Sequence, residues 1–216
     1  MRIGVLGTGM VGQTIATKLV SLGHEVCMGS RTAANPKAAE WAGASGALGS
    51  HGTFSDCARF GDILFNCTAG EGTIDAIESA GLENFRGKIL LDLSNPLDFS
   101  GGMPPVLFSG NFDSLGERIQ LLLPQTKVVK TLNTVNCRVM VAPKKLGGGD
   151  HHVFLCGNHA GAKSEVSRIF KEWFGWTHVL DIGDITMSRG LEVYVAFWVR
   201  LYMSLGTPDF NIKVVR

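Results

Sequence analysis

The chain has 216 residues, of which 45% are hydrophobic and 18% charged, and these figures suit one well-packed α/β domain with a small appendage. Its formal net charge of +1 gives no electrostatic reason to expect nucleic acid or an anionic membrane surface as a partner. The most apolar stretch, residues 191–205, contains Glu192 and Arg200 and falls short of the ~20 apolar residues that span a bilayer, so we expect no membrane partner.

Strand-like and helix-like segments alternate along the chain, without a repeat or a long linker. We predict strands at residues 2–6, 25–29, 63–67, 88–93, 127–132, 152–156 and 178–181, and a short one near 49–53. We predict helices at residues 10–22, 36–43, 73–81, 113–123, 160–173 and 187–205, and a brief helix capped by Ser55 or Asp56. Because the strand segments are continuously apolar, both faces of their sheet should be buried. The pattern predicts an α/β fold, a doubly wound Rossmann-type parallel sheet with a small C-terminal helical appendage.

A glycine-rich loop, Gly-Thr-Gly-Met-Val-Gly at residues 7–12, connects the first predicted strand to the first predicted helix. In this context Gly7 allows a tight turn, Gly9 lets the backbone approach a pyrophosphate, and Gly12 lets the helix pack closely on the strand. The start of the helix then offers free amides and partial positive charge to the phosphate. The loop therefore predicts a dinucleotide site; the alternative is a plain tight turn.

The end of the second predicted strand indicates which dinucleotide binds. An NAD site has an Asp or Glu about 20 residues after the glycines, where this chain has Ser30 and Arg31. A hydroxyl and a guanidinium suit a ribose that carries a 2′-phosphate, and Lys37 could add a second positive charge. The sequence thus favours NADP(H); the alternative is an ordinary solvated basic patch.

Small, polar or turn-forming residues follow three further predicted strands, at 68–70, 94–96 and 133–135. Ligands of this fold lie across the carboxyl ends of the strands, and Asn side chains there can bond a carboxamide. The alternative is that these residues only form turns. The six histidines show no zinc-ligand spacing, and we find neither a Ser-His-Asp triad nor a carboxylate pair, so no metal site and no catalytic residue is predicted.

Two segments could complete the site. Residues 95–112 are rich in Pro, Gly and Ser yet carry several large apolar side chains, which is typical of a functional loop. The last predicted helix, 187–205, is apolar around most of its circumference, so a second subunit should cover the face that its own domain leaves open. The alternative is a helix buried wholly in its own chain. The tail at 210–215 could add a last strand.

The five cysteines include no CxxC pair and lie in or near predicted elements. We interpret them as buried, reduced thiols. Met1 leads directly into the first strand, which leaves no room for a signal peptide. Both features predict a cytoplasmic protein.

Over essentially its whole length the chain resembles the NADP oxidoreductase family that uses the deazaflavin coenzyme F-420. The resemblance lies in RIGVLGTGMVGQTIA, LGHEVCMGSRT, KTLNT, MSRGLE and LGTPDFNIKVV. The chain is also similar to the cytosolic domain of the six-transmembrane metalloreductases, which pairs NADPH with a flavin. The archaeal deazaflavin enzymes carry a histidine in the segment 132–134, where this chain has Asn133, as in the metalloreductase relatives.

The resemblance implies an NADP-binding Rossmann-like domain at residues 1–185 and a C-terminal helix and tail at 186–216 that complete the acceptor site and form a dimer interface. By matching positions, the cofactor contacts are Thr8, Gly9, Met10, Val11, Ser30, Arg31, Lys37, Thr68 and Ala69, with Asn95, Pro96 and Leu97 nearby. The acceptor site would lie at Asn133 and Val135, with the tail at residues 206–210 beside it.

These observations predict a homodimeric, NADP(H)-dependent oxidoreductase that transfers a hydride between the nicotinamide and a flat small-molecule acceptor, F-420, FMN or FAD. A first alternative is an NADPH-dependent reductase of a small carbonyl or imine, for which Lys130 or Asp98 would have to supply a proton. A second alternative is a sensor that binds NADP without turnover.

Overall fold

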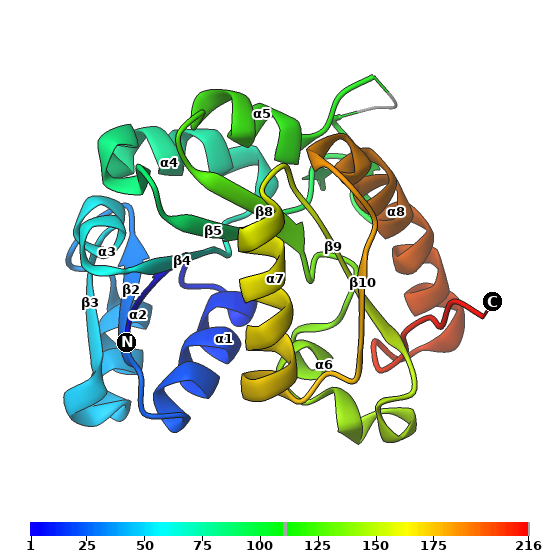
Figure 1. Ribbon diagram of the computed structural model, residues 1–216, viewed down its shortest axis with the longest axis horizontal. Coiled ribbons are helices and arrows are strands. Elements are labelled where there is room, and N and C mark those ends of the chain that lie inside the picture. The colour runs from blue at the N-terminus through cyan, green and yellow to red at the C-terminus, as the bar shows by residue number, and fades with distance from the viewer. Residues whose placement is uncertain (110–111, 216) are drawn as a thin grey trace.

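The computed structural model describes residues 1–109 and 112–215, and its centre is an eight-stranded sheet in the order β10-β9-β8-β5-β4-β1-β2-β3 (Figure 1). The strands are β1 Arg2–Leu6, β2 Glu25–Ser30, β3 Gly49–Thr53, β4 Ile63–Asn66, β5 Ile89–Asp92, β8 Lys127–Thr131, β9 His152–Cys156 and β10 His178–Asp181. The chain order reverses between β1 and β4, which is the switch point where this fold binds ligands. The predicted doubly wound Rossmann-type fold is confirmed, with one difference: β9 runs antiparallel to β8, and β10 follows β9.

Helices cover both faces of the sheet. They are α1 Met10–Ser21, α2 Pro36–Ala44, α3 Phe54–Phe60, α4 Thr73–Ala80, α5 Leu115–Leu122, α6 Cys137–Val141, α7 Ala160–Ile169 and α8 Ser188–Leu205. The first hydrophobic core joins the sheet to α1, α2, α6 and α7, and the second joins it to α3, α4 and α5. The sequence did not predict α6, whose five residues are too few to show a helical period and whose start is capped by Asn136.

The cap of α3 differs from the predicted one. Thr53, not Ser55 or Asp56, is the N-cap residue, and its hydroxyl accepts a hydrogen bond from the Asp56 amide at 3.1 Å. The Asp56 carboxylate accepts from the Thr53 amide at 3.0 Å, which completes a capping box. This arrangement holds the pKa of Asp56 below its usual value, because the Thr53 side chain, then the Thr53 backbone and, more weakly, Arg59 stabilise the charged form.

The interpretation of all five cysteines as free thiols is wrong for two of them. Cys27 on β2 and Cys57 on α3 form a disulfide, with their Cα atoms 5.3 Å apart. Cys67, Cys137 and Cys156 are free. The sequence placed Cys27 in a strand and Cys57 in a helix but could not show that α3 packs over β2, which brings the two side chains together.

The segment 95–112 is more ordered than a loop. It contains a small antiparallel pair, β6 Leu97–Asp98 and β7 Val106–Leu107, whose strands meet at Leu97 opposite Leu107. Residues 110 and 111 of this predicted loop lie outside the described residues.

The last helix is buried on one face only. Leu191, Val195 and Val199 are buried, whereas Phe197 is 56% and Met203 51% exposed. The alternative of a helix buried wholly in its own chain is therefore wrong. None of the helices in the described part of the chain has the length and apolar character needed to traverse a bilayer.

The tail packs beside α8 without forming the predicted strand (Figure 1). The Phe210 ring stacks on Trp198 at a centroid distance of 5.1 Å, and the Ile212 carbonyl accepts from the His152 amide at 3.0 Å. The Val214 amide donates to the ring of His152 and not to a backbone carbonyl, and the Lys213 side chain pairs with Asp150. In a strand, the backbone groups of these residues would bond to the backbone of a neighbouring strand instead.

Candidate functional site

The glycine loop has the geometry that a close backbone approach requires. Gly7 has φ +117°, and a Cβ there would stand 2.6 Å from the Cys67 carbonyl oxygen. A Cβ on Gly12 would overlap the Gly7 carbonyl oxygen, so this glycine allows α1 to pack against the loop. A Cβ on Gly9 would meet nothing within 4 Å, which means that this side of the loop is open.

The start of α1 is free to receive an anion. Its N-cap residue, Gly9, makes no side-chain cap, and its first turn contains no acidic residue. The first amides of the helix therefore keep their hydrogen-bonding capacity and partial positive charge for a ligand.

The glycine loop and the end of β2 border one cavity of about 710 Å³. It is lined by Gly7, Thr8, Gly9, Ser30, Arg31, Asn35, Phe54, Cys67, Thr68, Ala69, Glu71, Gly72, Asp75, Ala76 and Ser79. Seven residues that the sequence singled out are thus brought together. The other predicted cofactor residues, Met10, Val11, Gly12, Lys37, Asn95, Pro96 and Leu97, are not part of this lining.

Sequence reasoning missed the wall of this cavity that α3 and α4 provide. Phe54 is the first residue of α3, and Asp75, Ala76 and Ser79 lie on one side of α4. Their order in the chain gives no signal for this, because their place in the cavity depends on how both helices pack against the sheet. Asn35 could have been found, since it caps α2 directly after the basic segment.

The corner after β2 presents one buried and one exposed side chain. Ser30 is 3% exposed, and its hydroxyl donates to the Thr32 carbonyl at 2.6 Å, so it holds the turn. Arg31 and Lys37 are exposed, and Lys37 is the second residue of α2. Arg31 is the positive side chain that borders the cavity.

Three polar side chains lie in register at the carboxyl ends of β4, β5 and β8. Asn66 is the partner of Asp92, and Asp92 is the partner of Lys130. The Asn66 amide donates to Asp92 Oδ1 at 2.7 Å, and its own oxygen accepts from the Thr68 hydroxyl at 2.6 Å. The end of β5 is thereby connected to the loop after β4, which lines the cavity.

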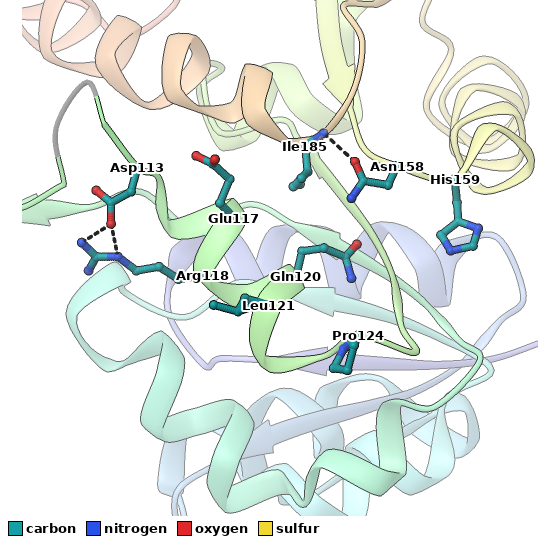
Figure 2. Close-up of a pocket in the computed structure, with 9 residues that line it drawn as sticks. All are labelled: Asp113, Glu117, Arg118, Gln120, Leu121, Pro124, Asn158, His159 and Ile185. Atoms are coloured by element: carbon teal, nitrogen blue, oxygen red, sulfur yellow. Dashed lines mark hydrogen bonds and ion pairs between the residues drawn. The ribbon is translucent and has the colours of Figure 1, made fainter.

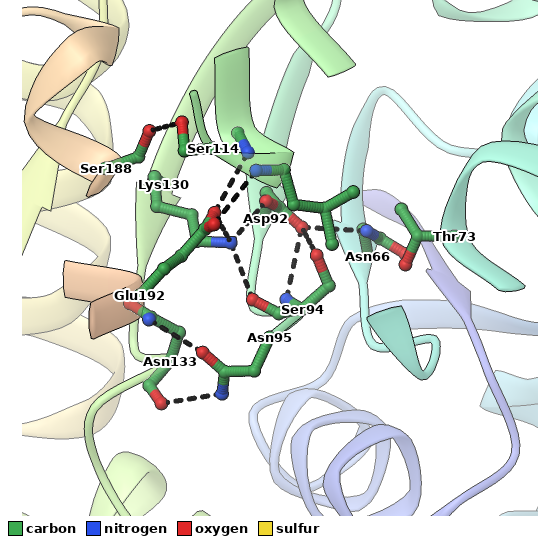
Figure 3. Close-up of polar contacts among 12 residues, drawn as sticks. Asn66, Thr73, Asp92, Ser94, Asn95, Ser114, Lys130, Asn133, Ser188 and Glu192 are labelled. Atoms are coloured by element: carbon green, nitrogen blue, oxygen red, sulfur yellow. Dashed lines mark hydrogen bonds and ion pairs between the residues drawn. The ribbon is translucent and has the colours of Figure 1, made fainter. Parts of the chain in front are cut away.

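Lys130 lies at the centre of a buried ion-pair cluster with Asp92 and Glu192 (Figure 3). Its Nζ is 2.9 Å from a carboxylate oxygen of each partner, and it also donates to the Ser94 carbonyl at 2.6 Å. All three side chains are at most 2% exposed. Burial opposes the charge on Lys130, but the two carboxylates outweigh it and raise the pKa above its usual value. Lys130 therefore remains protonated.

Glu192 extends this cluster to α5. Its carboxylate accepts from the amides of Leu115 and Gly116, the first residues of that helix, at 2.9 and 3.0 Å. It also accepts from the Ser109 hydroxyl at 3.3 Å. The N-cap residue of α5, Ser114, accepts from the Glu117 amide, and the acidic side chain from α8 satisfies the two amides that this cap leaves open.

The two asparagines that the sequence singled out lie side by side. Asn133 donates to the Asn95 side chain at 2.9 Å, and Asn95 donates back to the Asn133 carbonyl at 2.9 Å. Asn133 also donates to the Leu191 carbonyl of α8 at 3.1 Å. Leu132, which directly precedes Asn133, has φ +58°, an uncommon conformation for a residue with a side chain. Val135 is 5% exposed and belongs to the first core.

A second cavity, of about 630 Å³, lies between α5 and the 3-10 helix Ile185–Met187 (Figure 2). Its lining includes Gln120 from α5, Pro124 from the segment after this helix, and His159, the N-cap residue of α7. Pro124 precedes β8, so this cavity lies toward the amino end of that strand, away from the glycine loop. In the described residues, no cluster of three His, Cys, Asp or Glu side chains is arranged to hold a metal ion.

The chain matches the model of a known family. The model of the family described as NADP oxidoreductase, coenzyme F420-dependent, matches residues 2–96. A crystal structure from Arthrobacter sp. FB24, described as an F420-dependent NADP-reductase, is 47% identical and covers 100% of both chains, with a TM-score of 0.94.

Two more distant likenesses concern parts of larger proteins. Metalloreductase STEAP3 from Rattus norvegicus is 28% identical over 207 residues, which are 96% of this chain and 38% of that protein, so the chain spans less than half of this relative. The imine reductase from Myxococcus stipitatus, solved in complex with NADP⁺, is 12% identical with a TM-score of 0.66 over 95% of this chain and 63% of that one. At this identity the likeness concerns the fold alone.

Proposed function

Because the chain belongs to the coenzyme F420-dependent NADP oxidoreductase family, and is thus an NADP-dependent oxidoreductase, we propose that it transfers a hydride between NADP(H) and a flat ring such as a deazaflavin or a flavin. One observation carries the choice of cofactor. The open side of the glycine loop and the Arg31 side chain border the same cavity, where an NAD site would have an acidic residue after β2.

Each end of the dinucleotide has residues suited to it. The amides of Thr8 to Val11 and the glycine loop would bind the pyrophosphate. Arg31, with the turn held by Ser30 and with Lys37 nearby, would bind the 2′-phosphate. Thr68 and Ala69 would contact the ribose and phosphate beyond the switch point, and residues 95–97 the nicotinamide half.

The chemistry proposed needs orientation and the exclusion of water rather than an acid or base. Hydride transfer between two rings depends mainly on bringing the reacting atoms together, and the cofactor itself supplies the redox chemistry. Asn95 and Asn133 are joined by two hydrogen bonds and would lie at the nicotinamide half, which suits such a positioning role.

The two candidate proton donors of the carbonyl and imine alternative are poorly suited to that task. Lys130 is fully buried and paired with two carboxylates. Asp98 accepts hydrogen bonds from Ser100, which hold its pKa below the usual value and keep it charged at neutral pH. We therefore prefer a flat acceptor that takes a hydride directly.

The acceptor site would lie at the junction of β8, α8 and the tail. In this proposal residues 1–185 bind NADP, and residues 186–216 complete the site for F-420, FMN or FAD near Asn133 and Val135. Supporting observations are the bond from Asn133 to Leu191 on α8 and the stacking of Phe210 from the tail on Trp198.

We also propose that the exposed face of α8 pairs with a second copy of this chain. Val193, Phe197 and Met203 are 41%, 56% and 51% exposed on this helix, so the apolar surface extends over more than two turns.

The three free cysteines suit a cytoplasmic location, although the Cys27–Cys57 disulfide is unusual there.

The test is to follow NADPH oxidation at 340 nm with F-420, FMN and FAD offered in turn, and to offer NADP⁺ with each reduced acceptor. We expect turnover with at least one acceptor. A protein that binds NADPH but turns over none of the three would contradict hydride transfer to a flat ring and favour the sensor alternative. Turnover of a small cyclic imine alone would favour the reductase alternative.

A further inference from the structure

The buried cluster of Lys130, Asp92 and Glu192 contains more negative than positive groups. The carboxylates interact only with donors: Asp92 accepts from Asn66, Ser94 and Lys130. Glu192 accepts from two α5 amides, Ser109 and Lys130. One cation therefore faces two anions, and the remaining negative charge is only partly offset by the start of α5.

In the proposed binding mode, this cluster lies on the nicotinamide side of the switch point. The strand order divides the sheet at the switch point into β1-β2-β3 on one side and β4-β5-β8-β9-β10 on the other. Arg31 follows β2, so in the proposed function the adenosine half would lie over the first group and the nicotinamide over the second. Asp92 is the last residue of β5, and Lys130 lies opposite it on β8.

The two redox states of the cofactor differ in charge at that half alone. Hydride transfer takes two electrons and one hydrogen nucleus from C4 of the reduced ring and adds them to the acceptor, and the ring that remains is a cation. The phosphates carry the same charge in both states. A buried negative charge near the ring therefore stabilises the oxidised state relative to the reduced one.

We propose that the Asp92–Lys130–Glu192 cluster makes the site bind NADP⁺ more tightly than NADPH, so that the bound reduced cofactor is a stronger hydride donor. This inference rests on the proposed function and adds a direction to it, reduction of the acceptor by NADPH. It assigns Glu192 and Asp92 as residues that act through their charge and need not touch the substrate.

The experiment measures Kd for NADP⁺ and for NADPH by calorimetry, with wild type and Glu192→Gln. We expect the ratio Kd(NADPH)/Kd(NADP⁺) to be lower in Glu192→Gln than in the wild type, by a factor on the order of 10. This is the size of effect expected from one buried charge at an effective dielectric constant of ~20. The matched control is Glu117→Gln, which removes a carboxylate from α5 that is paired with Arg189 and partly exposed to solvent. Its ratio should change less than about twofold.

The ratio separates this effect from a structural one, because a distorted site would weaken both cofactors alike. If Glu192→Gln does not fold, Asp92→Asn serves as the second variant with the same expected sign. An unchanged ratio in a folded variant that binds both cofactors would overturn the inference and leave the proposed function intact. Failure of the wild type to bind either cofactor would overturn both.

Discussion

Replacing Arg31 by alanine should weaken the binding of NADPH about 10-fold and leave the binding of NADH nearly unchanged. Only NADPH carries the 2′-phosphate, and Arg31 is the positive side chain that borders the cavity after β2. A guanidinium can give two parallel bonds to a phosphate, which are stronger than neutral hydrogen bonds. Because Arg31 is exposed, solvent and salt screen its charge, so we expect about 10-fold rather than 100-fold.

Isothermal titration calorimetry of wild type and Arg31→Ala with both cofactors would measure this difference. The preference for NADPH should also shrink as salt is raised, since the contact is exposed. Arg59→Ala is a suitable control, because this arginine is exposed on α3 and pairs with Asp56 at 2.8 Å. If Arg31→Ala weakened NADH as much as NADPH, Arg31 would be acting on the turn or the pyrophosphate and not on the 2′-phosphate.

The remaining predictions concern the loop, the dimer and the disulfide. Gly9→Ala should keep the Tm of the wild type but weaken NADPH binding. Gly12→Ala should cost about 1–3 kcal/mol of stability, because its Cβ would overlap the Gly7 carbonyl oxygen. Equal Tm values for the two variants in thermal melts would contradict this difference. Phe197→Glu should convert a dimer into a monomer, as measured by size-exclusion chromatography with light scattering. The control Leu121→Glu, at an 83% exposed residue of α5, should leave the dimer intact. A wild type that is monomeric at a concentration of tens of micromolar would refute the dimer. Titration of the denatured protein without reductant should find three thiols and, after reduction, five; five from the start would mean that Cys27 and Cys57 are not bonded in the isolated protein.

The strands and the glycine loop could be predicted because both are local signals. Continuous apolar segments mark buried strands, and the loop follows the first strand directly. The direction of β9 could not be predicted in this way, because a segment such as HVFLC is equally apolar in a parallel or an antiparallel position. The Cys27–Cys57 bond and the contribution of Phe54 to the cavity also depend on packing between distant elements.

Two charged residues did carry a signal that sequence reasoning left unused. Lys130 stands inside an apolar strand and Glu192 inside an apolar helix, and a buried charge is costly unless it is paired. Each residue therefore requires a partner of opposite charge, and each is the other's partner in the structure, with Asp92 as the third member. The pattern predicts that a partner exists, but the identity of the partner needs the fold.

This pairing bears on how far the C-terminal segment can be regarded as an appendage. Glu192 on α8 contacts β8 through Lys130 and the start of α5 through two amides, and Leu191 beside it accepts a bond from Asn133. Removing one member of a buried ion pair leaves the others uncompensated, which is strongly destabilising. The loss of α8 would therefore disturb the buried cluster as well as the proposed acceptor side. In the proposed function the two parts of the chain, 1–185 and 186–216, thus share one site, and the charge that favours the oxidised cofactor comes from both.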